Sequence, residues 1–222
     1  MNRDRNELHQ VGVTLRVILF TIEDDQLSVV VTKRTIEPFK GSYNLPGGFI
    51  HNNESLEQAA SRIVQELTGD THLYTEQLYT FGDPDRDTNG WWITVAYFAL
   101  LPQDMHTHAP FRINPSCALL PVEKLPTLAF DHATMIEYAV NRLKAKVQYT
   151  NIAQGLLPEK FRLTSLQKTY EIILNKPLDK RNFRKKMSSL GLLQALNEKE
   201  ISGRHRPATL YKFKTKEQVF FD

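Results

Sequence analysis

Residues 45–69, LPGGFIHNNESLEQAASRIVQELTG, decide the fold of this 222-residue chain. Apolar residues in this stretch recur at i, i+3, i+4, i+7, i+8 and i+11, the spacing of one face of an α-helix: Leu56, Ala59, Ala60, Ile63, Val64 and Leu67. Gly69 follows directly, and glycine is favoured just past a helix end. The pattern predicts an amphipathic helix that follows a glycine-rich turn at Gly47 and Gly48.

Strand-like segments surround this helix. The β-branched runs 11–20 and 27–32 are separated by the turn-like residues 23–25, and 74–81 and 91–100 are two further predicted strands joined by the loop 82–87. Asp131 is expected to cap a second helix, which has an apolar stripe of Ile136, Ala139, Val140 and Leu143. Strands combined with segregated helices predict an α/β (α+β) unit, which we place at residues 1–150.

Residues 151–222 show a different order of elements. Thr164 is placed to cap a helix with Leu166, Tyr170, Ile173 and Leu174 on one face, and residues 175–177 end it. Asp179 then caps a second helix, with Phe183, Met187 and Leu190 inward and Gly191 at its end. A strand from 193, a loop at 202–207 and a returning strand at 210–213 complete an order typical of a winged helix-turn-helix domain.

Charge divides the chain at the same place. Residues 151–222 hold 15 lysines and arginines against 7 acidic residues, whereas residues 1–150 hold 13 against 18. A basic C-terminal third beside an acidic body is typical of a DNA-binding appendage, although a solvated, lysine-rich helical domain would show the same excess.

The remaining composition excludes several classes of protein. Hydrophobic residues make up 41% and charged residues 24%, values of a globular protein with a core rather than of a fibrous or disordered chain. Cys117 is the only cysteine, so no intramolecular disulfide can form, which fits a reducing compartment. No apolar run is long enough to span a bilayer, and the first ten residues lack the core of a signal peptide. We therefore expect a cytoplasmic protein without a membrane partner.

The spacing within residues 45–69 resembles the Nudix box, a loop–helix–loop framed by glycine, glutamate and arginine. Gly48, Glu54, Arg62, Glu66 and Gly69 stand at the framing positions. The resemblance extends over about residues 9–145 and implies the Nudix α/β/α sandwich, in which Glu54 and Arg62 brace the loop against the helix.

Two positions depart from the Nudix pattern. The family places three glutamates on one helix face, where they hold the Mg²⁺ ions of a hydrolase. Here Ile63 and Leu67 occupy the first and third of these positions, and only Glu66 remains, a weak candidate ligand for Mg²⁺. We therefore expect no catalytic residue and no required cofactor, and a domain that binds its ligand without hydrolysing it.

Three further stretches are similar to signatures of the Nudix-related transcriptional regulators: 82–87 (GDPDRD), 179–186 (DKRNFRKK) and 206–213 (RPATLYKF). The resemblance spans nearly the whole chain and implies a Nudix sandwich followed by a winged helix-turn-helix domain at 151–222. It also implies a homodimeric repressor of NAD metabolism or sugar catabolism that binds a double-stranded DNA operator and responds to ADP-ribose, a related nucleotide or a sugar. The alternatives are a Nudix hydrolase of ADP-ribose or another nucleoside diphosphate derivative, and a slow hydrolase that also binds DNA.

Two sets of candidate site residues follow. The expected ligand-binding set combines basic, aromatic and loop residues with closely approaching glycines: Arg34, Phe39, Gly47, Gly48, Asp83, Asp85, Arg86, Asp87 and Trp92. Phe39, Trp92 and the aspartates have the alternative roles of core rings and solvated turn residues. The expected DNA-binding set lies on the outer face of the second C-terminal helix and at the hairpin tip: Lys180, Arg181, Arg184, Lys185, Ser188, Arg204, His205 and Arg206. No cluster of histidine and cysteine has metal-site spacing, and His106 and His108 are expected to be exposed.

Overall fold

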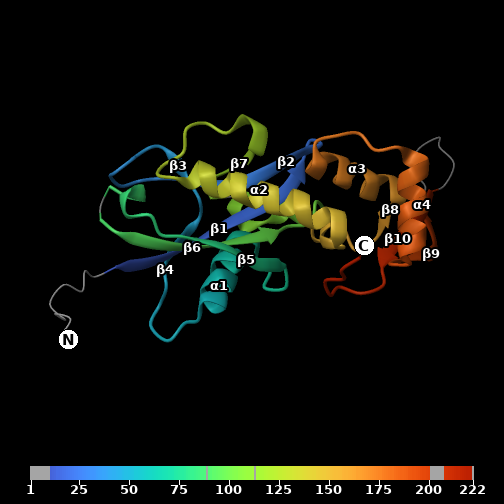
Figure 1. Cartoon of the computed structure of the whole chain (residues 1–222), viewed down its shortest axis with the longest axis horizontal. Coiled ribbons are helices and arrows are strands. Elements are labelled where there is room, and N and C mark those ends of the chain that lie inside the picture. The colour runs from blue at the N-terminus through green and yellow to red at the C-terminus, as the bar shows by residue number, and fades with distance from the viewer. Residues whose placement is uncertain (1–10, 89, 113, 201–207, 222) are drawn as a thin grey trace, which may run out of the picture.

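The computed structural model describes residues 11–88, 90–112, 114–200 and 208–221. Figure 1 shows an elongated molecule with a β-sheet at one end and a smaller, helix-rich unit at the other. The large sheet has the order β3-β2-β1-β6-β5, with β4 added to β1 and β7 added to β2. Its strands are β1 (Gly12–Glu23), β2 (Gln26–Lys33), β3 (Tyr43–Asn44), β4 (Gly47–Phe49), β5 (Tyr74–Phe81), β6 (Trp92–Leu100) and β7 (Cys117–Pro121). β1 and β6 run parallel, and the other pairs of this sheet are antiparallel.

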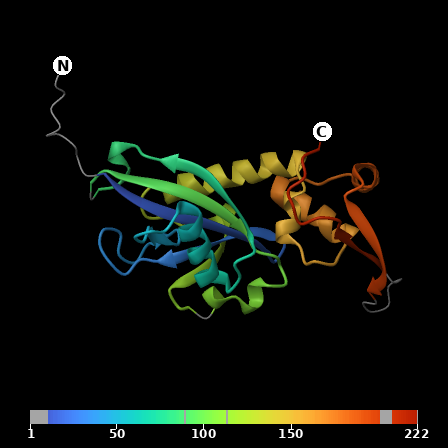
Figure 2. The same cartoon turned by 90° about the horizontal axis from the view of Figure 1, so that it is seen from below.

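Two helices cover opposite faces of this sheet, α1 (Leu56–Thr68) on one side and α2 (His132–Tyr149) on the other (Figure 2). Side chains of a strand alternate between the two faces. In β1, Leu15, Val17 and Leu19 accordingly pack in the core with α1, whereas Ile18 and Phe20 pack in the core with α2. This arrangement is the expected α/β/α sandwich.

The capping residues of α1 explain why it begins and ends where it does. The Ser55 hydroxyl accepts a hydrogen bond from the backbone N–H of Gln58, and the Gln58 side chain accepts one from the N–H of Ser55. This reciprocal capping box satisfies N–H groups that a helix start leaves free. Gly69 ends the helix in the left-handed conformation, at φ 77°. The helix predicted from residues 45–69 is therefore confirmed.

The smaller unit contains β8 (Phe161–Arg162), α3 (Leu163–Leu174), α4 (Lys180–Leu190), β9 (Leu193–Glu200) and β10 (Ala208–Phe213), with the strand order β8-β10-β9. This order is the expected winged helix. Asp179 caps α4 through the N–H of Asn182, and Gly191 ends the helix at φ 64°. The prediction that Thr164 caps α3 is wrong. Arg162 precedes the helix, because the chain arrives extended from β8 and turns helical at Leu163.

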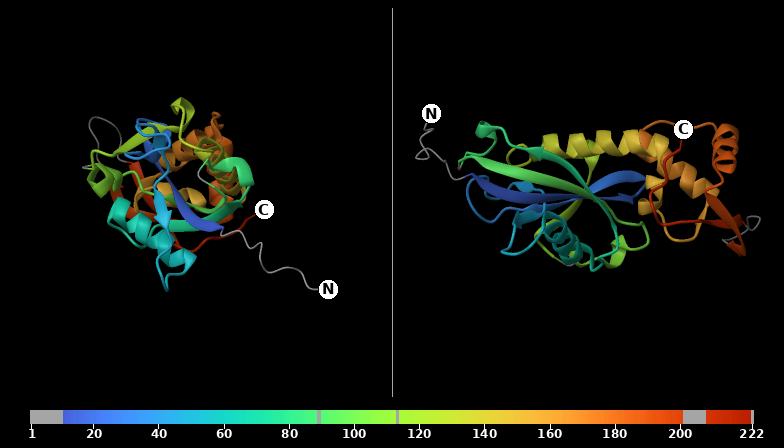
Figure 3. Two further views of the ribbon diagram at one scale, coloured as in Figure 1. Left: turned by 90° about the vertical axis from the view of Figure 1, so that its left-hand side faces the viewer. Right: turned by 60° about the horizontal axis from the view of Figure 1, so that its bottom comes forward.

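The two units are joined by a continuous core rather than by a free linker. One cluster of buried side chains extends from Ile18 and Phe98 of the sheet, through Leu143 of α2, to Phe183 and Met187 of α4. A short 3-10 helix (Ile152–Leu156) follows α2 and contributes to the same core. The right-hand view of Figure 3 shows α2 running from the sheet to the smaller unit.

Three short strands of the sheet, β3, β4 and β7, lie in segments for which the sequence pattern predicted no strand. β1 also extends to Glu23, because Asp24 and Asp25 both take a positive φ and turn the chain sharply into β2. Among the described residues, none of the helices combines the length and apolar content needed to cross a membrane.

Candidate functional site

The framing residues of the box form a brace. The Arg62 guanidinium donates to both carboxylate oxygens of Glu54, at 2.8 and 3.0 Å, and to the carbonyl of Phe49 at 3.4 Å. Glu54 also accepts a hydrogen bond from the N–H of His51. The hydrogen bond from Arg62, followed by that from His51, lowers the pKa of Glu54 to about 2. The pair thus holds the loop after β4 against α1.

The same helix does not provide the carboxylates of a metal site. Ile63 and Leu67 are 4% and 7% exposed and belong to the core between α1 and the sheet. Glu66 is exposed and lies 3.5 Å from Arg62, and the Asp70 carboxylate accepts a hydrogen bond from the N–H of His72. Within the described residues, no three His, Cys, Asp or Glu side chains are grouped so that they could hold a metal ion. A single carboxylate already paired with an arginine does not fit a resident Mg²⁺ ion.

Three arginines gather on the opposite face of the sheet, beside the start of α2. Arg16 comes from β1, Arg34 follows β2, and Arg86 belongs to the loop before β6. Burial, together with the positive charges of Arg34 and Arg86, lowers the pKa of Arg16 to about 10. Arg16 donates one hydrogen bond, to the carbonyl of Leu45 at 3.3 Å, and its shielded Nε has no partner among the described residues. We call Arg16, Arg34 and Arg86 the arginine cluster.

The other two arginines of the cluster are held in place by neighbouring groups. Arg86 donates two hydrogen bonds to the Asp131 carboxylate, at 2.7 and 2.9 Å, and one to the hydroxyl of Thr94. Arg34 donates to the carbonyl of Pro38, and its guanidinium carbon lies 4.8 Å from the centre of the Phe130 ring. Both side chains are therefore fixed before any ligand arrives.

His132 lies next to this cluster as a neutral group. Burial, reinforced by Arg16, Arg86 and Arg34, holds the pKa of His132 well below its ordinary value of 6.5. The ring Nδ1 accepts a hydrogen bond from the backbone N–H of Leu45 at 3.0 Å. His132 therefore adds no positive charge near neutral pH, and its role is to anchor the chain before β4 to the first turn of α2.

Aromatic pairs flank the arginine cluster. The rings of Phe49 and Trp92 are 5.6 Å apart, and those of Phe39 and Phe130 are 4.9 Å apart in an edge-to-face arrangement. Phe49 and Phe39 are 64% and 40% exposed, so both pairs offer ring surface to solvent. Phe49 lies opposite Thr14, two residues from Arg16 in β1, and therefore points to the same face of the sheet.

The predicted ligand-binding residues do not all lie in this constellation. Arg34, Phe39, Arg86 and Trp92 belong to it, and the charge of Asp87 acts on Arg16. Gly47, at φ 152°, brings β4 so close to β1 that a Cβ atom would lie 2.1 Å from the carbonyl oxygen of Leu15, whereas Gly48 has open space. Asp83 and Asp85 are exposed in the loop before β6.

Five residues of this site were not predicted from the sequence: Arg16, Phe49, Phe130, Asp131 and His132. The sequence does contain a signal for Arg16. It is a charged residue at an α2-facing position of β1, where the next two residues on that face, Ile18 and Phe20, are apolar. The prediction that His106 is exposed is wrong. It is 8% exposed, its Nδ1 contacts the carbonyl oxygen of Gln103, and its Nε2 lies 3.6 Å from Glu23.

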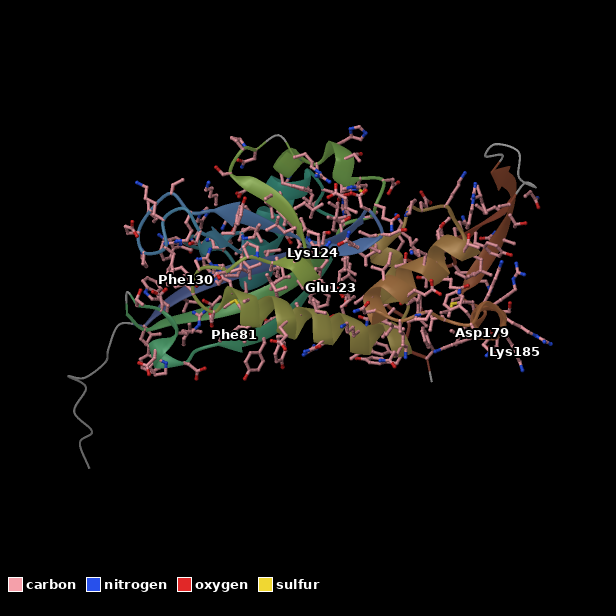
Figure 4. The ribbon with its side chains drawn as sticks, turned by 90° about the horizontal axis from the view of Figure 1, so that it is seen from above. Phe81, Glu123, Lys124, Phe130, Asp179 and Lys185 are labelled. Atoms are coloured by element: carbon pink, nitrogen blue, oxygen red, sulfur yellow. The ribbon has the colours of Figure 1, made fainter. Side chains whose placement is uncertain are left out.

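The second site is the outer surface of α4. Phe183 and Met187 are buried as expected, and Leu190 is partly buried against the same core. The predicted DNA-binding residues of the helix are all exposed: Lys180, Arg181, Arg184, Lys185 and Ser188. Figure 4 shows Lys185 pointing away from the body at the far end of the molecule. Arg204, His205 and Arg206 lie outside the described residues.

Family models match both units. The NUDIX domain model matches residues 13–139, and the model of the NrtR DNA-binding winged helix domain matches residues 153–213. The chain is 35% identical over 216 residues to the ADPR responsive transcriptional repressor NtrR of Acinetobacter baylyi, with 94% of this chain and 84% of that protein covered.

Solved structures match as well. Shewanella oneidensis NrtR complexed with a 27mer DNA is similar with a TM-score of 0.83 and 37% identity, covering 91% of this chain and 93% of that one. The Nudix domain of the same Shewanella protein, complexed with ADP ribose, gives a TM-score of 0.51 and 38% identity, covering 64% of this chain and 94% of that one.

Proposed function

The chain belongs to the NrtR family of Nudix proteins with a winged helix, and from that premise we propose that it is a transcriptional repressor that releases its DNA operator when ADP-ribose binds. It acts in the cytoplasm as a homodimer, because a single helix-turn-helix module contacts only one half-site of an operator. The Nudix domain, residues 1–150, receives the effector, and residues 151–222 bind DNA.

The arginine cluster carries the proposal for the effector site. A charged guanidinium that is shielded from water and faces two like charges is costly unless an anion compensates it. The diphosphate of ADP-ribose is such an anion, and arginine matches phosphate oxygens with paired N–H donors. The pairs Phe49–Trp92 and Phe39–Phe130 offer apolar ring faces on which an adenine base can stack. Arg86 already pairs with the Asp131 carboxylate, whereas Arg16 and Arg34 have no carboxylate partner among the described residues. An uncharged sugar would bring no negative charge to Arg16 and Arg34, so the geometry favours the nucleotide effector.

DNA binding is assigned to the exposed face of α4. Arg181, Arg184 and Lys185 form no ion pair among the described residues, so their charges are available to DNA. With Phe183 and Met187 fixing the opposite face in the core, α4 presents these side chains as the recognition helix of a winged helix does.

The hydrolase alternative has less support from the site. Its metal ligands would stand at Ile63 and Leu67, where both side chains complete the core under α1. A domain that binds ADP-ribose without stabilising the transition state of its hydrolysis acts as a receptor.

Calorimetry with the full-length protein tests the proposal. ADP-ribose is titrated into the protein alone and into the protein saturated with a duplex that it has selected from a random-sequence library. Binding free energies are reciprocal, so a ligand that releases DNA must bind more weakly to the DNA complex, on the order of 5–150-fold for a typical coupling. Absence of ADP-ribose binding, or equal affinities in both titrations, would overturn the proposal. Pentoses titrated in parallel are expected to give no heat.

A further inference from the structure

Helix α2 touches both proposed sites. It begins at His132, next to the arginine cluster, and ends at Tyr149, beside the winged helix. In Figure 4, Phe130, two residues before the start of α2, lies at the opposite end of the molecule from Lys185 of α4 and its capping residue Asp179. The helix is continuous over its 18 residues, so it links the two ends as a rigid element.

The far end of α2 is tied directly to the recognition helix. Lys186 of α4 donates a hydrogen bond to the carbonyl of Gln148 at 3.4 Å, and its ammonium group lies 5.5 Å from the ring centre of Phe221. The N–H of Phe221 in turn donates to the carbonyl of Tyr149 at 2.9 Å. We call residues 214–221 the C-terminal strap, because this segment runs from β10 back onto the end of α2.

Several further contacts fasten the strap. Asn151 exchanges hydrogen bonds with Val219 and donates one to the carbonyl of Glu217. The buried ammonium group of Lys146 in α2 reaches Gln218 of the strap at 3.4 Å. A shift of α2 is therefore passed to α4 both directly and through the strap.

The near end of α2 contains a residue with two competing partners. Asp131 occupies the N-cap position, where aspartate normally accepts a hydrogen bond from the first turn of the helix. Its carboxylate makes no such bond, because both oxygens accept hydrogen bonds from Arg86. The first turn thus lacks the cap that this residue type provides elsewhere in the chain, at Asp179.

We propose that Asp131 is the positioning residue that couples the effector site to DNA, by exchanging the Arg86 guanidinium for the first turn of α2 when an anion binds the arginine cluster. A phosphate that bonds to Arg86 competes with the Asp131 carboxylate for the same N–H donors. The displaced carboxylate then caps α2, because the free N–H groups of the helix start attract an anion. This inference rests on the proposed function and adds the regulation of the same site.

Room for the accompanying movement lies beside the contact between α2 and α3. An open cleft of about 390 Å³ lies beside their junction, lined by Ile136 and Val140 of α2, by Ile172 of α3 and by Leu27 of β2. Closely packed interiors resist small displacements, so an open cleft beside this junction is where α2 has room to move against α3. The ends of α2 and α4 stay connected through Lys186 and the strap, and α4 follows.

Two substitutions distinguish the two roles of the Asp131 side chain, pairing with Arg86 and capping α2. Asp131→Asn keeps a good N-cap but loses the charge that holds Arg86. It is expected to mimic the ligand-bound state, with ADP-ribose bound about 5-fold more tightly or better, the selected duplex bound more weakly, and the coupling factor close to one. Asp131→Glu keeps the charge but is a poor cap, so duplex affinity is expected to remain and ADP-ribose to release the duplex less effectively.

Calorimetry and duplex anisotropy on the full-length variants provide the test, with thermal unfolding to verify that each is folded. A merely structural role would weaken both ligands or neither, and would not move their affinities in opposite directions. If ADP-ribose and the duplex bind independently to the wild-type protein, the proposed function itself is refuted. Wild-type coupling that Asp131→Asn leaves unchanged would refute only the role of Asp131.

Discussion

Replacing Arg16 with methionine tests the arginine cluster through stability and binding together. Burial and the charges of Arg34 and Arg86 lower the pKa of Arg16 from the ordinary value of an arginine to about 10. At pH 7 the guanidinium is charged in both the folded and the unfolded state, so the cost of holding that charge is fully present in the folded protein. At about 1.4 kcal/mol per pKa unit, this cost is about 3 kcal/mol.

Methionine fills similar space without charge, but it loses the hydrogen bond to the carbonyl of Leu45, which contributes about 1 kcal/mol. The free energy of unfolding should therefore rise by about 2 kcal/mol, which for a chain of this size raises the Tm by about 4–8 °C. The affinity for ADP-ribose should fall although the stability rises. Loss of one charge-assisted hydrogen bond to the diphosphate, about 1.5–3 kcal/mol, weakens ADP-ribose by about 10- to 150-fold.

Thermal unfolding and calorimetry on the same preparations provide the two measurements. Arg142→Met is the matched control, because Arg142 lies on α2 and pairs with Glu76. This variant is expected to gain no stability and to bind ADP-ribose as the wild type does. An Arg16→Met protein that is no more stable than wild type, or that binds ADP-ribose equally well, would refute the role assigned to the arginine cluster.

Four further predictions follow from the same structure. Arg181→Ala and Arg184→Ala should each weaken binding of the selected duplex by about 1–3 kcal/mol in an anisotropy assay, whereas the exposed Lys124→Ala on the body should not. Because the pKa of His132 is held well below 6.5, this side chain binds a proton in the unfolded chain but not in the folded protein as pH falls below about 6.5. The free energy of unfolding of the wild type should therefore fall with pH by up to about 1.4 kcal/mol per pH unit more than that of His132→Gln, as measured by denaturant titration. Gly47→Ala should lower the free energy of unfolding by about 1–3 kcal/mol or more from backbone strain and the contact with Leu15, and an equally unstable Gly48→Ala would contradict the close approach of β4. Phosphate release from ADP-ribose with Mg²⁺ and a phosphatase should stay near background. Turnover at about 1 s⁻¹ would contradict the proposal that the Nudix domain binds ADP-ribose without hydrolysing it.

Local patterns predicted the helices well. The apolar stripe and Gly69 define α1, and Asp179 and Gly191 define α4, because helix hydrogen bonds and caps connect residues close together in the sequence. Short strands are different. β4 has three residues, two of them glycines, and is a strand only because it lies against Leu15 and Arg16 of β1. No property of its own sequence indicates that partner.

The site was predictable only in part for the same reason. Arg34, Arg86 and Trp92 were predicted as ligand-binding residues because they lie in or next to loops and strand ends, and the structure places all three at the arginine cluster. Arg16 is a single polar residue within an apolar strand, and its meaning depends on Arg34 and Arg86, which are distant in the sequence. Asp131 was expected to cap α2, and its different role follows from the approach of Arg86 across the sheet edge.

The position of ADP-ribose in a crystal of the full-length protein tests the central claim most directly. We expect density for the diphosphate against the guanidinium groups of Arg16, Arg34 and Arg86, with the adenine on one of the two aromatic pairs. Density for the diphosphate along the Glu54–Arg62–Glu66 side of α1, with the arginine cluster untouched, would contradict it.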